Sequence, residues 1–233
     1  MRTLGIDEAG RGAIIGPLVI VGFCAHDSLT EYLWSMGIKD SKQLSPKQRN
    51  EVYKKLKGWT EKVDEKRNHY LDVVKIIKIK PDEIDRAVLE HQLNWLEARY
   101  FAKIIEHFEL EDIRMQVFVD SPDSIPIRFK DFINCYLVTS PIIEIISANH
   151  ADENNVFVAA ASIVAKITRD REIQKLHKLY GDFGTGYPSD PKTIAFLKAK
   201  YNQSSIKPDY TRKTWKTWQK IEDEFRQEML PIV

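Results

Sequence analysis

The order of strand-like and helix-like segments is the feature that most constrains how this chain folds. Five segments have the short, β-branched-rich or alternating composition of strands: residues 3–6, 17–23, 70–80, 116–120 and 142–146. The first two follow each other directly, whereas helical patterns separate the later ones, and only helical patterns follow residue 156. This order predicts an α/β fold, in which helices flank a mixed five-stranded sheet and a helical extension ends the chain.

Local signals place several of the helices. Ser45 stands at a cap position, Pro46 at the first helical position and Gln48 completes a capping box, while Gly58 is placed to end the helix. Apolar residues three or four apart across residues 88–107 predict one long amphipathic helix. Further helices are predicted over residues 156–180, with Gly181 just past the end, over residues 191–201 and around residues 218–225.

The composition allows a substantial core without indicating a partner. The chain has 233 residues, of which 43% are hydrophobic, enough for one large domain or for one domain with an extension. We predict a domain over residues 1–183 and an extension over residues 184–233. Lys and Arg total 35 against 34 Asp and Glu, so a surface that binds nucleic acid must come from a local patch.

Two further features bear on where the protein works. Cys24 and Cys135 are too few for a disulfide scaffold or a thiolate metal site, which indicates a reducing compartment, and we expect a cytoplasmic protein. The longest apolar run, residues 13–25, is interrupted by Gly16 and Pro17 and falls short of the roughly 20 residues that span a bilayer. We therefore expect no membrane segment.

Three aspartates follow predicted strands: Asp7, Asp120 and Asp152. If those strands are neighbours, their downstream ends converge at the edge where α/β sheets bind ligands. Clustered carboxylates repel one another unless a divalent cation neutralises them, and an all-oxygen ligand set selects Mg²⁺ or Mn²⁺ over zinc. Two such ions about 3.5 to 4 Å apart stabilise both the attacking water and the leaving oxygen of a phosphodiester. The pattern therefore implies a divalent metal site.

Each of these acidic residues also has a structural interpretation. Asp120 alone is more typical of a turn-forming residue, and Asp152 is placed to cap the helix that follows it. Glu8 comes directly after Asp7, so an unbroken strand would direct it to the opposite face of the sheet. We expect the strand to break there, because Gly10 and Gly12 allow backbone conformations that other residues rarely adopt.

Five sets of motifs follow one another along the chain: GIDEAGRG at residues 5–12 with IGPLVI at 15–20, KDSKQL at 39–44, VD at 119–120 with a proline after it, AASIVAK at 160–166 with RD at 169–170, and GTGYPSDP at 184–191. Together they resemble the type 2 ribonuclease H family, ribonuclease HII, over nearly the whole chain. Residues 184–191 and 208–215 resemble its archaeal branch. Ala13 stands where archaeal members often carry Pro, and Ala159 where the family often has Ser, but both replacements are small and apolar and put no proposed catalytic role in doubt.

The resemblance implies a role for each matching residue. Four carboxylates match the catalytic set that holds the metal ions: Asp7, Glu8, Asp120 and Asp152. The other matches are expected to bind substrate: the backbone of Gly10, Arg11 and Gly12 at the ribose 2′-hydroxyl, Tyr187 at the RNA-to-DNA junction, Ser41 and Lys42 at backbone phosphate, and Lys166, which shares a helical face with Arg169, at the hybrid.

General chemistry agrees with part of this assignment. A glycine lets the main chain approach a sugar closely, and the 2′-hydroxyl is the group that distinguishes RNA from DNA. Without Gly186 and Pro188 beside it, Tyr187 would be more typical of a half-buried loop aromatic. The charges at Lys166 and Arg169 are at least as typical of a surface run.

The resemblance also implies the activity. It indicates an endoribonuclease that hydrolyses the RNA strand of RNA–DNA hybrids and cuts on the 5′ side of ribonucleotides embedded in duplex DNA. Two Mg²⁺ or Mn²⁺ ions would assist, and the products would carry 3′-hydroxyl and 5′-phosphate ends. Such an enzyme would remove misincorporated ribonucleotides and RNA primers during DNA replication and repair.

The C-terminal stretch mixes basic and aromatic residues: Arg212, Lys213 and Lys216 alternate with Tyr210, Trp215 and Trp218. We expect the rings to pack inward and the charges to face outward, where they could contact the DNA strand. Gln227 and Leu230 partly match a sliding-clamp peptide, but the aromatic pair of such a peptide is absent. A sliding clamp therefore stays an open partner, and we expect a monomer.

Two other functions remain to be separated from this one. A junction resolvase of similar fold shares carboxylates at strand ends but needs neither the glycine pair nor Tyr187. A hybrid-binding module without catalysis gains nothing from clustered negative charge facing phosphates. A cleavage assay with and without Mg²⁺ separates catalysis from binding alone.

Overall fold

The computed structural model describes residues 1–38, 44–66, 73–108, 114–138 and 143–228. The chain divides into two compact units. Unit 1 comprises residues 1–9, 19–78 and 94–168, and unit 2 comprises residues 10–18, 79–93 and 169–233. Each unit thus contains segments that are distant in sequence, while the domain boundary after residue 183 stays a prediction. Among the described helices, none combines the length and the hydropathy needed to cross a membrane.

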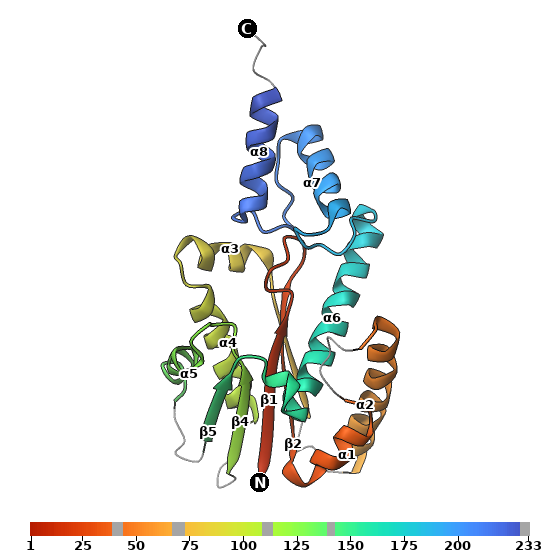
Figure 1. The fold of residues 1–233 in the computed structure, drawn as a ribbon, viewed down its shortest axis with the longest axis vertical. Coiled ribbons are helices and arrows are strands. Elements are labelled where there is room, and N and C mark those ends of the chain that lie inside the picture. Colours follow the sequence, from red (N-terminus) through yellow and green to blue (C-terminus); the bar gives the residue numbers. More distant parts are fainter. Residues whose placement is uncertain (39–43, 67–72, 109–113, 139–142, 229–233) are drawn as a thin grey trace. The chain divides into compact units, whose positions relative to one another are not determined.

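A five-stranded mixed sheet forms the centre of unit 1 (Figure 1), which confirms the predicted fold class. The strands are β1 (Arg2–Ala9), β2 (Leu18–His26), β3 (Val74–Ile79), β4 (Met115–Asp120) and β5 (Ile143–Ala148), in the order β3-β2-β1-β4-β5. β1 is antiparallel to β2 and parallel to β4, and β4 is parallel to β5. The carboxyl ends of β1, β4 and β5 therefore lie at the same edge of the sheet.

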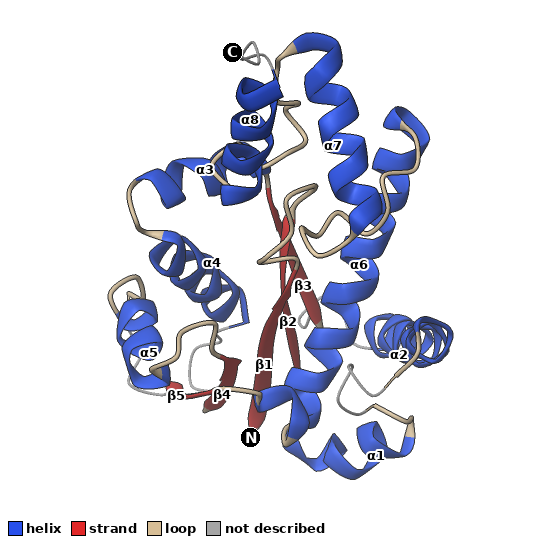
Figure 2. Ribbon diagram, turned by 45° about the horizontal axis from the view of Figure 1, so that its top comes forward, coloured by secondary structure: helices blue, strands red, loops and turns tan. Residues whose placement is uncertain are grey.

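The helices are drawn in Figure 2: α1 (Thr30–Ser35), α2 (Pro46–Lys66), α3 (Pro81–Leu89), α4 (Leu93–Phe108), α5 (Pro126–Asn134), α6 (Val156–Tyr180), α7 (Pro191–Ser204) and α8 (Lys216–Glu228), with short 3₁₀ turns η1 (Asp27–Leu29) and η3 (Ala151–Glu153). The capping box is confirmed, since the Ser45 N–H donates to Gln48 Oε1 at 2.9 Å and the Gln48 N–H donates to Ser45 Oγ at 3.3 Å. The bounds of α6, with Gly181 at φ +91° just beyond it, are also as predicted.

Two predictions about helices were wrong. Gly58 does not end α2, which continues to Lys66, because one glycine within a helix costs only about 1 kcal/mol relative to alanine. The single helix predicted over residues 88–107 is two helices, separated by a turn in which His91 adopts φ +57°. Leu89 and Leu93 are four residues apart, so their spacing looks continuous across that turn. Pro126 opens α5, which the sequence analysis did not predict.

The predicted break of the first strand at Glu8 was also wrong. β1 stays paired with β2 through Glu8–Ile20 and Ala9–Val19, and the turn begins only at Gly10, which adopts φ +90°. The antiparallel partner thus holds the strand for two residues beyond Asp7, whereas the parallel pairing to β4 ends at Ile6–Val119. Side-chain alternation in this unbroken strand directs Asp7 and Glu8 to opposite faces of the sheet.

Helix α6 packs closely against one face of the sheet because Gly5 has no side chain. A Cβ at Gly5 would lie 2.1 Å from the backbone carbon of Phe157 and 2.2 Å from the nitrogen of Val158. Val21 and Phe23 belong to the same hydrophobic cluster as α6 and α2. α4 covers the opposite face, where a Cβ on Gly22 would meet Ile104. In Figure 1, α2 and α6 lie on one side of the sheet and α4 and α5 on the other.

Candidate active site

Asp7 lies near the downstream end of β1 on the face that α6 covers, and it is only 3% exposed. Burial and the charges of Asp120 and, less strongly, Asp152 raise the pKa of Asp7 to about 7, although Lys166 and a hydrogen bond with Ser162 oppose the shift. The three aspartates predicted from the strand ends therefore influence one another through their charges. The structure brings these three predicted site residues together in unit 1.

The close packing of α6 explains how Ser162 and Lys166 reach Asp7. Gly5 to Asp7 is two strand residues, an advance of about 6.6 Å, and residue 158 to Ser162 is four helical residues, about 6 Å. The helix and the strand therefore advance by nearly the same distance. As a result Ser162, which is fully buried, lies next to Asp7 and forms a hydrogen bond with it. Lys166, one turn further along, donates from Nζ to Ser162 Oγ at 2.8 Å. A lysine thus supports the aspartate through a serine.

The other two aspartates lie at the last residue of β4, which is Asp120, and in the turn after β5, which holds Asp152. Asp120 Oδ1 accepts a hydrogen bond from the Ala151 N–H at 3.0 Å. Asp152 is 1% exposed and lies within the η3 turn. The role of helix cap considered for Asp152 is filled by Asn155, whose Oδ1 accepts from the N–H groups of Phe157 and Val158 at 3.0 and 3.2 Å.

A polar network that the sequence did not predict connects the loop after β4 to the loop after β5. Asn149 Nδ2 donates to the carbonyls of Ser121 and Asp123, at 3.1 and 2.8 Å. Asp123, which is 2% exposed, accepts from Arg128 Nε at 2.8 Å and from Asn94 at 2.9 Å. Its hydrogen bond with Arg128 lowers the pKa of Asp123 to about 2. An aspartate three residues before a helix-starting proline is a local turn signal, but Asn94 and Asn149 are distant from it in sequence.

The donor chemistry of this carboxylate group fits a hard divalent cation. The charge of Asp7 is unfavourable where it stands, and each of Asp7, Asp120 and Asp152 offers only carboxylate oxygens. Within the described ranges, no three His, Cys, Asp or Glu side chains already have the arrangement of a preformed metal site. The match between these carboxylates and a divalent cation therefore rests on their charge and their oxygen donors, and not on a preformed coordination geometry.

The glycine turn, defined as residues 10–12, lies in unit 2. Its two glycines differ in whether the fold leaves room for a side chain. Gly10 has φ +90°, and a Cβ there would lie 2.7 Å from Cδ and Nε of Arg169, so the fold itself requires glycine. Gly12 is exposed, and a Cβ there would meet no protein atom within 4 Å. The fold thus tolerates a side chain at Gly12, and the bare backbone there is open to an external group.

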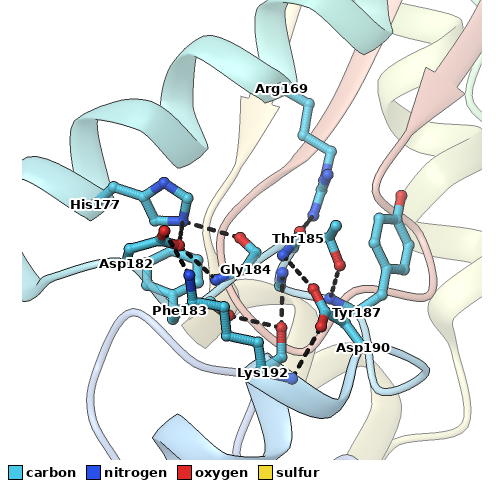
Figure 3. Close-up of polar contacts among 11 residues, drawn as sticks. Arg169, His177, Asp182, Phe183, Gly184, Thr185, Tyr187, Asp190 and Lys192 are labelled. Carbon is cyan, nitrogen blue, oxygen red and sulfur yellow. Dashed lines mark hydrogen bonds and ion pairs between the residues drawn. The ribbon is translucent and has the colours of Figure 1, made fainter.

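Tyr187 lies in a loop between α6 and α7 that several hydrogen bonds hold (Figure 3). Asp190 accepts hydrogen bonds from the N–H groups of Thr185 and Lys192, at 2.7 and 2.9 Å. Arg169, which is 5% exposed, donates from Nη2 to the Thr185 carbonyl at 2.9 Å, and its guanidinium lies 4.3 Å from the centre of the Tyr187 ring. Arg169 is therefore a buried support of the tyrosine and not part of a surface charge run.

The prediction that the charges of the basic C-terminal stretch face outward was wrong at one position. Lys213 and Lys216 are exposed and Trp218 is buried, as predicted, but Arg212 is completely buried. Its guanidinium donates to backbone carbonyls of residues 10, 11 and 16, acceptors some 200 positions earlier in the chain that a local pattern does not reveal. Ser41 and Lys42, the predicted phosphate contacts, lie outside the described residues.

Comparison with known proteins decides the family. The family model for ribonuclease HII matches residues 4–218. The chain belongs to the ribonuclease HII family. A ribonuclease HII from Pyrococcus horikoshii is 40% identical over 232 residues, which cover 100% of this chain and 98% of that protein. This confirms the resemblance that the motifs indicated.

Solved ribonucleases of this family share the fold. The crystal structure of the ribonuclease H2 from Pyrococcus horikoshii OT3 matches with a TM-score of 0.81 and 40% identity, over 97% of this chain and 100% of that one. The ribonuclease HII of Archaeoglobus fulgidus, solved in a complex with PCNA, matches with a TM-score of 0.74 and 33% identity, over 92% and 95% of the two chains. This ribonuclease HII is accordingly an endoribonuclease acting on RNA–DNA hybrids, and its family uses divalent metal ions.

Proposed function

We propose that this ribonuclease HII hydrolyses the RNA strand of hybrids and also cuts on the 5′ side of single ribonucleotides embedded in duplex DNA, leaving 3′-hydroxyl and 5′-phosphate ends. The observation that carries the proposal is the buried Asp7, whose pKa is raised towards neutrality by burial and by the charges of Asp120 and Asp152. Carboxylates that disfavour one another's ionisation are suited to share a cation beside a phosphodiester.

Asp7, Glu8, Asp120 and Asp152 are the proposed metal-holding and catalytic residues. Mg²⁺ or Mn²⁺ bound there would supply charge neutralisation at the phosphate and activation of a water nucleophile. Asp7 is oriented by Ser162, and Asp120 by the Ala151 N–H. Because alternation directs Glu8 to the other face of the sheet, its assignment rests on the family motif alone.

The glycine turn is the proposed contact for the ribose 2′-hydroxyl. Gly12 supports this role, because the fold does not need a glycine there and a side chain would only occupy space outside the protein. Backbone groups at such a position can approach a sugar closely, and the 2′-hydroxyl both donates and accepts hydrogen bonds. The turn begins three residues after Asp7 in the sequence, so substrate selection and chemistry are encoded in one short segment.

Tyr187 is the proposed contact at the RNA-to-DNA junction, where its ring would stack on the deoxynucleotide. The guanidinium of Arg169 beneath its ring and the hydrogen-bonded loop fix the tyrosine in place. Lys166 stays a proposed contact to the hybrid, although its hydrogen bond to Ser162 ties its charge to Asp7 as well. Ser41 and Lys42 stay proposed contacts to phosphate.

The proposal is tested with two labelled duplexes, one carrying a lone ribonucleotide and one a full RNA strand, assayed with Mg²⁺, with Mn²⁺ and with a chelator. We expect cutting 5′ of the ribonucleotide only when a divalent cation is present. Asp120→Asn should reduce the rate by at least about a thousandfold, because a neutral amide neither binds the cation strongly nor carries the charge.

Asp131→Asn is the matched control, since Asp131 is an exposed aspartate of α5 and should be dispensable. Cleavage in chelator, or full activity of Asp120→Asn, would contradict the assignment. Products with 5′-hydroxyl ends would contradict the proposed reaction while leaving the site in place.

A sliding clamp is a proposed protein partner because the Archaeoglobus fulgidus relative was solved in a complex with PCNA. The C-terminal match to a clamp peptide extends to Leu230, which lies outside the described residues. Co-elution of the full chain with a clamp, compared with a chain that ends at residue 226, tests this partner. We also propose that the enzyme acts as a monomer in the cytoplasm.

A further inference from the structure

Arg212 is fully buried in unit 2 and binds the carbonyl oxygens of the glycine turn. Its Nη1 donates to the Arg11 carbonyl at 2.5 Å, and its Nη2 donates to the Gly10 carbonyl at 2.6 Å. Trp215 adds a longer contact, from Nε1 to the Gly12 carbonyl at 3.4 Å, and its ring centre lies 4.8 Å from the Arg212 guanidinium carbon. All three carbonyls of the turn therefore accept hydrogen bonds from Arg212 and Trp215.

These contacts also fix the amide N–H groups of the turn. No cis peptide bond is present in the described chain, and in a trans peptide the C=O and the following N–H point in opposite directions. Since the carbonyls of Gly10 and Arg11 point to the buried guanidinium, the N–H groups of Arg11 and Gly12 point away from it. Gly12 itself is exposed, and a Cβ there would meet no protein atom within 4 Å, so the turn is open at this residue.

Arg212 is itself held by backbone on both sides. Its N–H donates to the Ile14 carbonyl at 2.9 Å, beside the bridge between Ile15 and Thr211. Asp85 of α3 then accepts from the N–H groups of Lys213 and Thr214, at 2.8 and 3.0 Å. The guanidinium therefore sits on a fixed backbone segment rather than at the end of a mobile one.

A guanidinium is a costly way to fill a buried space. Removing a charge from water costs several kcal/mol, so an apolar residue would anchor the segment at least as well if anchoring were its whole role. What an apolar residue cannot do is bind two consecutive carbonyls in a fixed plane, which the rigid fork of arginine does. The choice of arginine thus indicates that the orientation of the peptide units in the turn matters.

We propose that Arg212 is a positioning residue that sets the preference of the enzyme for a ribonucleotide over a deoxynucleotide, by fixing the N–H groups of the glycine turn. The inference rests on the proposed function of that turn as the contact for the 2′-hydroxyl. Arg212 acts through the turn and needs no contact with the substrate itself. Trp215 assists it at the Gly12 carbonyl.

The test measures the affinities of the full-length protein for two duplexes, one with a single ribonucleotide and one of DNA alone. Asp120→Asn is present throughout so that the substrate stays intact, and the ratio of the two dissociation constants is the readout. Arg212→Lys keeps the charge but lacks the planar fork, so we expect the preference for the ribonucleotide to fall about five- to tenfold, the worth of one hydrogen bond. Affinity for the DNA duplex should stay within about twofold.

Two further variants make the result decisive. Trp215→Phe keeps an aromatic ring but removes the N–H donor to Gly12, and it should lower the preference about two- to threefold. Lys220→Gln is the matched control, because Lys220 is an exposed lysine of α8 outside the basic stretch, and it should leave the ratio unchanged. Melting temperatures verify that each variant is folded.

Different results would contradict the positioning role of Arg212 and the proposed sugar contact of the glycine turn. Folded Arg212→Lys and Trp215→Phe proteins with an unchanged ratio would overturn the positioning role, as would equal losses of affinity for both duplexes, which indicate an anchor only. If the reference protein itself shows no preference for the ribonucleotide, the role of the glycine turn fails and the inference fails with it.

Discussion

The carboxylate group of unit 1 and the glycine turn of unit 2 are built in opposite ways. Asp7 is buried among like charges that raise its pKa, so the group is electrostatically unfavourable until something positive joins it. The glycine turn is satisfied internally, since Arg212 and Trp215 bind each of its carbonyls. The carboxylate group therefore needs a bound cation to become favourable. The glycine turn already has the conformation that would contact the substrate.

This difference indicates a division of labour. A buried group of carboxylates is suited to catalysis, because binding of a cation and a phosphate strongly changes the free energy of its ionised form. A preorganised backbone is suited to selection, because it loses little entropy when a sugar binds. Variants in the two regions should therefore fail in different ways, and the predictions below are ordered from the largest effect to the smallest.

The two glycines of the turn offer the sharpest test of the preorganised region. Gly12→Ala should leave the melting temperature unchanged, because no protein atom lies within 4 Å of the added Cβ, yet it should lower kcat/KM at a lone ribonucleotide about a hundredfold. Gly10→Ala should lower the melting temperature as well, by roughly 2 to 10 °C, because Gly10 has φ +90° and a Cβ there meets Arg169. Full activity of a folded Gly12→Ala protein would contradict the proposed contact between the glycine turn and the ribose 2′-hydroxyl.

Tyr187→Ala should affect the two substrates unequally. A tyrosine at a junction matters where one ribonucleotide meets DNA, so we expect about a tenfold loss of cleavage at a lone ribonucleotide and a smaller loss on a long hybrid. Tyr187→Phe keeps the stacking ring over Arg169 and isolates the hydroxyl. Equal losses on both substrates for Tyr187→Ala would contradict the junction role.

Asp7→Asn should stabilise the protein when divalent ions are removed. The pKa of Asp7 is 3.8 in the unfolded chain and about 7 in the folded one, so between these values the folded chain keeps a proton that the unfolded chain has lost. Stability therefore falls as the pH rises through this window. In chelator near pH 8, Asp7→Asn should melt roughly 2 to 8 °C above the wild type.

The same comparison near pH 4 supplies the control. There the wild-type aspartate is largely protonated in the folded chain, so the advantage of Asp7→Asn should nearly vanish. Adding Mn²⁺ near pH 8 should also narrow the gap, because only the wild type gains from the cation at this position. A gap that is the same at both pH values would show that charge at Asp7 is not the cause.

The sequence predicted the carboxylate region better than the glycine turn, for a physical reason. Asp7 and Asp120 lie at strand ends, and strand ends have a local signal in hydrophobicity and turn residues. The position of Arg212 depends on acceptors at residues 10 and 11, and nothing near residue 212 indicates them. A basic residue beside tryptophans looks like a surface contact when only its neighbours are visible.

The errors in the fold have the same origin. β1 continues past Glu8 because β2 pairs with it there, and the turn begins only at Gly10. The break between α3 and α4 occurs within a spacing of leucines that suits an unbroken helix. Asn149 and Asp123 connect two loops about 26 residues apart through backbone contacts that have no signature in side-chain periodicity.

The division of labour is tested most directly by the preference for ribonucleotide over DNA in a protein that no longer cuts. Asp120→Asn should lose cleavage and still bind the ribonucleotide duplex more tightly than the DNA duplex, by the same ratio as the intact site measured in chelator. Adding Gly12→Ala should bring that ratio close to one. If Asp120→Asn by itself abolishes the preference, selection and chemistry are not separable and the account is wrong.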